Sequence, residues 1–392
     1  SCLFGQLSQD ISPKSFTYQS DQTVTTITMP DLDVDALLAE DENRPPWKPF
    51  RYGHKFTVDL SPSNAGSWWN LPNGGRIWRL KIESTGAFAL SLEFDRFHLP
   101  LNSTLHVYSP DKSEIYGAYT SQNNNPDNIF ATPLVKGNTV IMEFFLPKTS
   151  EEFSLHLSEV IHDYIDIMDI TQNPTRNCGV NVVCPEADNY QDQVNAAAWL
   201  DMGAYICSGA MINNTSMDLT PYFLTADHCV EGENPATFRF YFNYETSSCS
   251  GSNAGYGSYA YGSILRSRSN GMDPDFALVE ITGNVYDSWD VFYAGWTRSA
   301  SAPVVSSGVH HPGGAPKKIN FDNDYASSSP GINWGDAGYS PPGSHWGIIW
   351  DEGGTEGGSS GSPAFDVNGR IIGQLSGGSG GCDSGDGYYG KF

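Results

Sequence analysis

The sequence contains 392 residues, of which 45 are acidic and 21 are basic, and its formal net charge is −24 at pH 7. This excess of negative charge argues against nucleic-acid binding as the main role, and the length predicts two or three domains. Only 17% of the residues are charged whereas 13% are aromatic, a composition typical of a folded protein and not of an acidic disordered chain. No run of 18 apolar residues occurs, so we expect no membrane-spanning helix.

The chain begins with Ser-Cys-Leu-Phe-Gly, an apolar stretch followed by small and polar residues. This pattern is typical of the end of a signal peptide near its cleavage site. We therefore interpret residues 1–9 as a signal-peptide remnant and expect Cys2 to be removed on export. A free thiol or a lipid-anchored cysteine is the alternative for Cys2, although the surrounding residues lack a clear lipobox.

Residues 10–172 are predicted to form a β-rich region without a catalytic motif. Its acidic segment, residues 31–42, is interpreted as solvated, because a calcium loop would need a glycine and a spaced terminal glutamate. Short runs with alternating apolar and polar residues follow at 76–82, 88–94, 104–108 and 139–145. Alternation of period two with close turns predicts antiparallel strands in a small sandwich.

A change in composition separates this region from the rest of the chain. Residues 1–177 hold 8 of the 41 glycines and one of the seven cysteines. We interpret residues 173–177 as a polar linker and residues 178–392 as a second domain. Its apolar runs at 238–242, 276–281 and 370–375 are also predicted to be strands.

The six cysteines after residue 177 form no CxxC pair, which argues against a zinc ribbon or a thioredoxin-like motif. An even set in one region indicates three disulfides in a secreted protein. No glycine-rich loop has the pattern of a nucleotide site, so we expect no cofactor. His310 and His311 could suggest a metal site, but no third spaced ligand is nearby, and structural hydrogen bonding is the preferred interpretation.

Three stretches carry the residue types that nucleophilic catalysis requires. They are Leu224-Thr225-Ala226-Asp227-His228-Cys229, Asp273-Pro274-Asp275-Phe276-Ala277-Leu278 and Gly357-Gly358-Ser359-Ser360-Gly361-Ser362-Pro363. A serine hydroxyl becomes nucleophilic when a neutral imidazole takes its proton, and a buried carboxylate fixes the tautomer of that imidazole. Glycines beside the serine allow a sharp turn and bring backbone N–H groups to the negative intermediate.

In the order His, Asp, Ser, these stretches together resemble the trypsin-like serine proteases of the chymotrypsin fold. The resemblance implies that His228 is the general base, that Asp275 orients it and that Ser360 is the nucleophile. It also implies that the backbone N–H groups of Gly358 and Ser360 form the oxyanion hole.

Two other aspartates compete for a place in this site. Asp227 is adjacent to His228, and we predict that it lies on the surface because the side chains of adjacent residues generally diverge. Asp273 competes with Asp275, but the Phe-Ala-Leu run directly after Asp275 favours Asp275.

Within this class, the second domain looks like the bacterial lysyl endopeptidases and their secreted relatives from about residue 178 to residue 392. The resemblance rests on the cysteine spacing of Cys178-Gly-Val-Asn-Val-Val-Cys184, on Asn213-Asn214, Tyr222-Phe223-Leu224, Ala294-Gly295-Trp296, His310-His311-Pro312 and Gly373-Gln374-Leu375.

The resemblance has three structural implications. The fold class is all-β, with a double antiparallel β-barrel of chymotrypsin type. A β-rich, sandwich-like pro-domain precedes this protease domain and acts as a pro-region in cis. The family's disulfides map as Cys178–Cys382, Cys184–Cys249 and Cys207–Cys229. Arg176, the only basic residue between Lys148 and the second domain, is the expected site of pro-region release.

The residues expected to contact substrate around the S1 pocket are Ser376, Gly377, Gly378, Asp386 and Gly387. Lysyl endopeptidases carry an S1 aspartate two residues before the tyrosine of a Tyr-Gly-Arg/Lys segment, but Gly387 has that place here and Asp386 is one position off. Without a buried carboxylate the ammonium group of a lysine would be unpaired. Basic P1 specificity (P1 being the residue before the cut bond) is therefore only slightly favoured.

Ser376 and Trp334 mark a further departure from the family. Lysyl endopeptidases carry a histidine in place of Ser376, stacked on a tryptophan that matches Trp334. In most trypsin-like enzymes a serine at this position supports the catalytic aspartate. We therefore expect the triad to survive and the His–Trp stack to be missing.

The sequence as a whole predicts a secreted serine endopeptidase, made as a zymogen, that hydrolyses protein or peptide substrates through an acyl-enzyme. Two alternatives remain: an apolar or other P1 preference, and a non-catalytic binding protein on a protease fold. The family continues beyond Phe392 through a final strand and a helix, so we expect the protease domain to be incomplete at its C-terminus.

Overall fold

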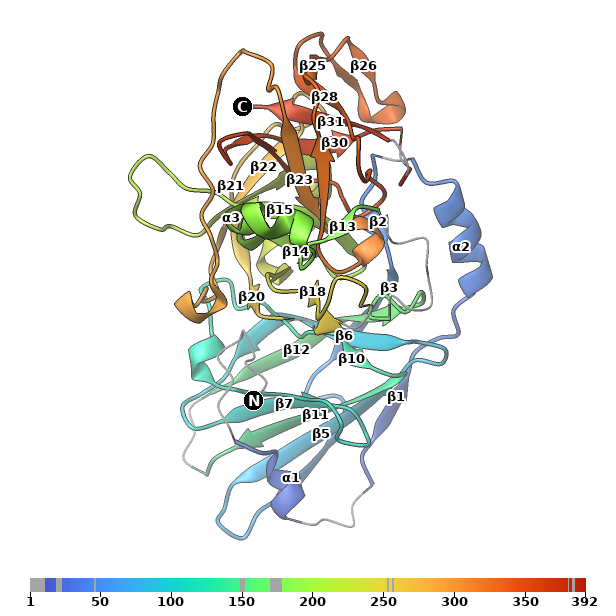
Figure 1. The fold of residues 1–392 in the computed structure, drawn as a ribbon. Helices are drawn as coiled ribbons and strands as arrows, with labels where there is room; N and C mark the ends of the chain where they lie inside the picture. The colour runs from blue at the N-terminus through green and yellow to red at the C-terminus, as the bar shows by residue number, and fades with distance from the viewer. Residues whose placement is uncertain are drawn as a thin grey trace. The chain divides into compact units, whose positions relative to one another are not determined.

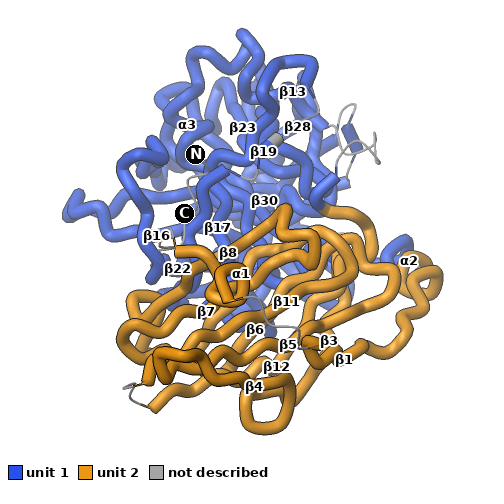
Figure 2. The backbone as a smooth tube through the Cα atoms, turned by 90° about the horizontal axis from the view of Figure 1, so that it is seen from below, with its two compact units in different colours: residues 1, 40–51, 168–392 blue, residues 2–39, 52–167 orange. Residues whose placement is uncertain are grey.

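The computed structural model describes residues 11–18, 23–45, 47–148, 152–169, 178–251, 254–255, 257–379, 381–382 and 385–392 (Figure 1). The signal-peptide remnant with Cys2, the linker and Arg176 lie outside these residues. The chain divides into two compact units (Figure 2): the N-terminal unit holds residues 2–39 and 52–167, and the catalytic unit holds residues 40–51 and 168–392. None of the helices described is long and apolar enough to span a bilayer.

The N-terminal unit contains two sheets. The first has the order β1-β5-β11-β7-β8, with β4 paired to β5, and the second has the order β10-β6-β12-β3, with β9 paired to β6. The strands of the first sheet are β1 (Thr26–Thr28), β4 (Ser67–Asn70), β5 (Arg76–Glu83), β7 (Thr104–Tyr108), β8 (Ile115–Tyr119) and β11 (Thr139–Leu146). Those of the second are β3 (Gly53–Leu60), β6 (Ala89–His98), β9 (Phe130–Ala131), β10 (Val135–Lys136) and β12 (Ser154–Asp163).

The four strands predicted in this unit are β5, β6, β7 and β11. Alternation explains them, because on β5 the buried Leu80 and Ile82 lie opposite Met142 and Val140 of β11 in one apolar layer. The unit is not wholly antiparallel, since β1 runs parallel to β5. The acidic segment forms the helix α2 (Val34–Glu42), which buries no residue and so agrees with a solvated stretch. A short helix α1 (Lys14–Thr17) precedes it.

The catalytic unit contains two eight-stranded sheets, and they form the double β-barrel that the resemblance implied. The first has the order β20-β17-β14-β15-β16-β22-β21, with β2 paired to β15. Its strands are β2 (Phe50–Arg51), β14 (Ala197–Asp201), β15 (Tyr205–Met211), β16 (Tyr222–Ala226), β17 (Arg239–Tyr241), β20 (Tyr259–Tyr261), β21 (Ser263–Arg268) and β22 (Phe276–Ile281).

The second sheet has the order β13-β24-β23-β29-β30-β31-β28-β25. Its strands are β13 (Val180–Asn181), β23 (Ser306–His310), β24 (Lys318–Asp322), β25 (Ser327–Ser328), β28 (His345–Ile349), β29 (Pro363–Asp366), β30 (Ile371–Gly377) and β31 (Asp386–Lys391). Two small hairpins pair β18 (Glu245–Thr246) with β19 (Ala254–Gly255) and β26 (Ile332–Asn333) with β27 (Tyr339–Ser340). Two short α-helices, α3 (Gln191–Ala196) and α4 (Asp227–Val230), complete the regular elements that matter for the site.

Each barrel has its own apolar core. Phe223, Phe240 and Val279 belong to the core of the first sheet, and Trp350 and Leu375 belong to that of the second. A third cluster contains residues of both sheets, including Ala210, Leu224, Val309 and Phe365. The two barrels are thus joined by packed side chains, which fixes the loops that each barrel contributes to the site.

The three disulfides are the pairs that the resemblance implied: Cys178–Cys382, Cys184–Cys249 and Cys207–Cys229. The last of them joins β15 to α4, the helix that carries His228.

Candidate active site

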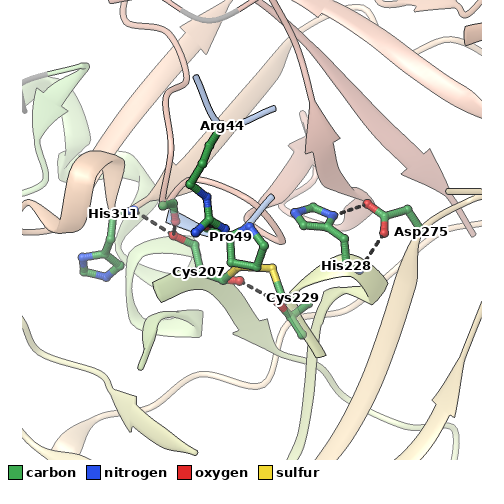
Figure 3. Close-up of a disulfide and its surroundings, with 10 residues drawn as sticks. Arg44, Pro49, Cys207, His228, Cys229, Asp275 and His311 are labelled. Carbon is green, nitrogen blue, oxygen red and sulfur yellow. Dashed lines mark hydrogen bonds and ion pairs between the residues drawn. A yellow bond between two sulfur atoms is a disulfide. The ribbon is translucent and has the colours of Figure 1, made fainter. Parts of the chain in front are cut away.

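His228 and Asp275 come from two neighbouring chain segments of the first barrel. His228 lies on α4, directly after β16, and Asp275 directly precedes β22, the strand that pairs with β16. The Asp275 carboxylate accepts the backbone N–H of His228 at 3.0 Å and faces Nδ1 of its imidazole at 2.8 Å (Figure 3). Because Asp275 is completely buried, this carboxylate holds the ring in one orientation.

The tautomer of His228 follows from this contact. A carboxylate only accepts hydrogen bonds, so Nδ1 carries the proton and Nε2 presents a lone pair. Nε2 is buried and makes no hydrogen bond within the described part of the chain. The imidazole is therefore oriented as a base whose accepting atom is available.

Asp227 does not lie on the surface, so the sequence-based prediction for it is wrong. Its side chain is 2% exposed and forms an ion pair with Arg268, and it also accepts the backbone N–H of Gly271 at 2.6 Å. The backbone N–H of Asp227 donates to the carbonyl of Asp275 at 2.9 Å. Arg268, 41 residues further along the chain, supplies the positive charge that allows the Asp227 carboxylate to be buried. Through these bonds Asp227 connects α4 to the loop that carries Asp275.

Ser360 lies on a tight turn that only glycine flanks can form. Gly358 and Gly361 have φ values of +91° and +80°, which favour glycine. A side chain at Gly361 would also lie 2.2 Å from the hydroxyl of Thr225 and 2.8 Å from the backbone nitrogen of Ala226. This close approach sets the turn against the end of β16, two residues before His228. Ser360 itself is 4% exposed, and no hydrogen bond joins it to His228 among the described residues.

Ser208, which the sequence analysis did not single out, holds this turn in place. Its N–H donates to the carbonyl of Ser360 and its hydroxyl donates to the carbonyl of Gly358, both at 2.8 Å. Its hydroxyl also accepts the backbone N–H of His311 at 3.0 Å. Because two carbonyls of the turn are fixed in this way, the backbone N–H groups between them are fixed too.

The backbone N–H groups of Gly358 and Ser360 make no hydrogen bond within the described ranges, whereas those of Ser359 and Gly361 donate to Glu356 and Leu375. Two free donors on one rigid turn beside a serine are what a developing oxyanion requires. The geometry is thus compatible with the role expected for Gly358 and Ser360.

His310 and His311 both make hydrogen bonds within the protein. Both are buried, and Nδ1 of His311 lies 2.9 Å from the carbonyl of Ala315. Burial lowers the pKa of His310 to about 3, so this ring is neutral at ordinary pH. Its Nε2 faces Oδ1 of Asn320 at 3.2 Å and its Nδ1 lies 2.7 Å from the hydroxyl of Ser359. His310 therefore accepts from Ser359, the residue between the two candidate oxyanion donors, a role that the sequence did not reveal.

Ser376 is buried, but its partner is not the one expected. Its hydroxyl lies 3.1 Å from Nε2 of His345 on β28. His345 also packs against Trp334, with ring centroids 6.0 Å apart and planes inclined by 52°. The expected absence of a histidine at position 376 therefore does not leave Trp334 without a histidine neighbour. His345 contacts Trp334 instead, with tilted and not stacked rings. Burial lowers the pKa of His345 to about 4.

A cavity of about 220 Å³ adjoins Ser360. Two of the residues predicted around S1, Gly377 and Gly378, border it together with Thr355 and Glu356. Asp386 does not border it: this residue begins β31, and its carboxylate accepts the N–H of Ser379 at 2.6 Å. Gly387 pairs with Ile348 of β28 and does not border the cavity either. Two acidic residues border the cavity: Asp41, which is paired with Arg51, and Glu356, four residues before Ser360.

Four groups in the described chain bring three potential metal ligands within 4.8 Å of one another. Three of these groups contain disulfide cysteines, whose sulfur atoms are committed to each other. The fourth consists of Asp322, Asp324 and Asp351, none of which borders the cavity beside Ser360. Burial raises the pKa of Asp322 to about 6.

Comparison with known proteins gives a consistent result. Residues 172–390, more than half of the chain, match the family profile of the lysyl endopeptidase C-terminal domain, and residues 61–160 match that of the lysyl endopeptidase N-terminal domain. The chain is 27% identical to a lysyl endopeptidase of Pseudomonas aeruginosa over 336 residues, which cover 79% of this chain and 70% of that protein.

Solved structures match the chain at lower sequence identity. A Glu endopeptidase has a TM-score of 0.34 at 17% identity, over 55% of this chain and 90% of that one. The Rv3671c protease of M. tuberculosis in its active form has a TM-score of 0.36 at 15% identity, over 55% of this chain and 86% of that one.

Proposed function

The chain belongs to the lysyl endopeptidase family and is a serine endopeptidase, and from this premise we propose that it is secreted, works through an acyl-enzyme formed on Ser360 and prefers a basic P1 residue. The observation that carries the mechanism is the buried pair of His228 and Asp275, which leaves Nε2 of His228 without a partner among the described residues.

In the proposed reaction, Oγ of Ser360 adds to the carbonyl carbon of the substrate while Nε2 of His228 takes the hydroxyl proton. The Asp275 carboxylate stabilises the imidazolium that results. The N–H groups of Gly358 and Ser360 bind the oxyanion, and the C–N bond breaks when His228 returns the proton to the leaving nitrogen. Water then hydrolyses the ester on Ser360 by the same route.

A fluorophosphonate probe tests the nucleophile. Such a probe should label the processed wild-type protein at Ser360 and should not label Ser360→Ala. Ser299→Ala, which removes an exposed serine hydroxyl, is the matched control and should be labelled like the wild type. If the processed wild-type protein is not labelled, the proposed mechanism is wrong.

Glu356 supports the basic P1 preference. It borders the cavity beside Ser360, and a carboxylate there would pair with the ammonium or guanidinium group of a bound lysine or arginine. Glu356→Gln should lower kcat/KM for substrates with a basic P1 residue by about tenfold or more and leave apolar P1 substrates little changed.

Asp386→Asn is the control for this comparison, because Asp386 carries a carboxylate in the same region but does not border the cavity. A peptide library should show the loss of basic P1 preference in Glu356→Gln alone. If Asp386→Asn loses it instead, the S1 acid is Asp386. A wild-type preference for apolar P1 residues would reject basic specificity.

Secretion and an inhibitory N-terminal unit complete the proposal. Three disulfides are typical of proteins folded in an oxidising compartment, and residues 61–160 match the N-terminal domain of the family. N-terminal sequencing of the secreted enzyme should find a mature chain that starts at Asn177, after cleavage at Arg176.

A further inference from the structure

Residues 40–51 stand apart from the sequence around them. They lie between two stretches of the N-terminal unit, yet they belong to the catalytic unit. Their last two residues form β2, which pairs antiparallel with β15: Phe50 lies opposite Ile206 and Arg51 opposite Tyr205. The next residue of β15, Cys207, is disulfide-bonded to Cys229, the neighbour of His228. A strand is thus added to the catalytic barrel directly beside the candidate triad.

The chain upstream of β2 crosses the triad itself. Lys48 and Pro49 border the cavity that adjoins Ser360, and they also border a second cavity of about 550 Å³ that contains His228 and Asp275. Figure 3 draws Pro49 together with the disulfide and the His228–Asp275 pair. His228 is 9% exposed and Ser360 is 4% exposed, so little of either residue is open to solvent while the segment is present.

Two glycines leave room for aromatic side chains of this segment, and the ring of Tyr205 contacts one of its arginines. A side chain at Gly357 would lie 2.7 Å from the ring of Phe50, and one at Gly335 would lie 2.9 Å from the ring of Trp47. The guanidinium group of Arg44 lies 5.1 Å from the ring centroid of Tyr205, a cation–π contact.

The segment also stabilises its own shape. Arg44 donates to the carbonyl of Pro49 at 3.1 Å, and the N–H of Lys48 donates to the carbonyl of Pro45 at 3.0 Å. Arg51 forms ion pairs with Glu40 at 3.0 Å and with Asp41 at 2.7 Å. These bonds close residues 40–51 into a compact loop. The segment is therefore already ordered within the chain, and it does not lose the conformational entropy that a flexible peptide would lose on binding.

Both basic residues between Glu40 and β2 are followed by proline: Arg44 by Pro45 and Lys48 by Pro49. An endopeptidase with a basic P1 preference would otherwise cut a segment that lies across its own triad. The proline nitrogen is tied into a ring and carries no hydrogen. The ring therefore crowds the nitrogen to which His228 would have to deliver a proton.

We propose that residues 48–51 occupy the substrate cleft in the direction of a substrate, with the Lys48–Pro49 bond at the position of the bond to be cut, and that Pro49 keeps this bond intact. Residues 40–51 are then an internal ligand that blocks the site until the N-terminal part is removed. This inference rests on the proposed serine endopeptidase mechanism. It also assigns the end of β15, at Tyr205 and Ile206, as the surface that binds the substrate residues after the cut bond by strand addition.

Replacement of the proline tests this register. In Pro49→Ala, Oγ of Ser360 adds to the Lys48 carbonyl carbon, the bond to the nitrogen of residue 49 breaks, and that nitrogen takes the proton through His228. Water then releases Lys48 as a new C-terminus. Mass spectrometry of the full-length chain should find a cut after Lys48, which should be absent when Pro49→Ala is combined with Ser360→Ala.

Pro45→Ala is the matched control, because it also removes a proline that follows a basic residue. It should produce no cut after Arg44. A cut after Arg44 in that variant, or no cut after Lys48 in Pro49→Ala, would overturn the proposed register.

A second variant tests the block independently of self-cleavage. Phe50→Ala removes the ring that packs on Gly357 and should raise the rate of fluorophosphonate labelling of the full-length protein at least tenfold. Phe88→Ala, an exposed phenylalanine of the N-terminal unit, should label at the wild-type rate. Equal labelling rates in the wild type and Phe50→Ala would refute the block. If even the processed protein starting at Asn177 fails to label, the proposed mechanism has failed and not this inference.

Discussion

The N-terminal unit and the catalytic unit use buried polar side chains in different ways. In the N-terminal unit such residues bond across adjacent strands: His156 on β12 contacts Asp95 on β6 and Asp59 on β3, and these three strands are neighbours in one sheet. The catalytic unit also has such a pair, Arg239 with Asp201 on the adjacent strands β17 and β14. At its candidate active site, however, the contacts hold loops and turns, as His228 does with Asp275 and His310 with Ser359.

This difference indicates which polar contacts should affect catalysis and which should affect only stability. A bond between neighbouring strands adds to an arrangement that the backbone ladder already fixes, so its loss should cost stability alone. A bond between segments 47 or 49 residues apart fixes a loop that carries a reacting group, so its loss should cost catalysis. The four predictions below test this contrast, from the largest expected effect to the smallest.

Asp275→Asn should lower kcat on the order of 10⁴-fold with little change in the folded structure. An amide can donate to Nδ1 of His228, which favours the tautomer with the proton on Nε2 and removes the base. Steady-state kinetics of the processed enzyme measure this effect. Asp273→Asn is the matched control and should retain near wild-type kcat; a comparable loss in that variant would mean that the wrong aspartate has been assigned.

His310→Ala should lower kcat by about ten- to a hundredfold, because the Ser359 hydroxyl loses its acceptor and the turn with the oxyanion donors loses a support. KM should change less than kcat, since the donors act on the transition state and not on the bound substrate. Ser359→Ala should show a similar split. A rise in KM with unchanged kcat in both variants would place His310 in substrate binding.

Sequence patterns predict those candidate groups whose chemistry is local. His228, Asp275 and Ser360 each stand in a short stretch whose residue types show a base, a carboxylate or a nucleophile with glycine flanks. The strands β5, β6, β7, β11 and β22 were also predictable, because their apolar residues alternate or form continuous runs that match one or both faces of a sheet.

Contacts made by tertiary structure escaped sequence analysis for a physical reason. The sequence around Asp227 does not indicate that Arg268 pairs with it, so the burial of this carboxylate could not be predicted. The contacts of His345 with Ser376 and Trp334 were not predicted. They depend on the register of β28 in the sheet, which the sequence does not show. Strand addition by Phe50 at β15 joins segments more than 150 residues apart, and short strands carry no sequence signal for their partner.

Asp227→Asn should lower kcat by about tenfold, a smaller loss than that of His310→Ala. The amide oxygen can still accept the N–H of Gly271, but the ion pair with Arg268 is lost, so α4 and the Asp275 loop are held less firmly. Glu231→Gln is the control: Glu231 contacts the same guanidinium at 3.5 Å but its side chain is 66% exposed. Steady-state kinetics should leave this control within about twofold of the wild type.

His156→Gln should lower the stability of the N-terminal unit by about 1 kcal/mol or less and leave fluorophosphonate labelling of the full-length protein at the wild-type rate. Partial burial opposes the charge on His156, but hydrogen bonds to Asp95 and Asp59 outweigh it and raise the pKa of this residue. A group whose pKa is raised on folding binds its proton more tightly in the folded state. Its contribution is therefore fully present below the unfolded pKa of 6.5 and disappears as the pH rises through the raised value.

Hydrogen exchange of β12 and β3 in the full-length protein measures this contribution. The wild type should be protected more than His156→Gln at pH 5.5, and the difference should vanish at pH 9 once the intrinsic exchange rate is corrected. His98→Gln, an exposed histidine of β6, should match the wild type at both pH values. A changed labelling rate in full-length His156→Gln would contradict the contrast, because a bond between adjacent strands of the N-terminal unit would then affect the active site.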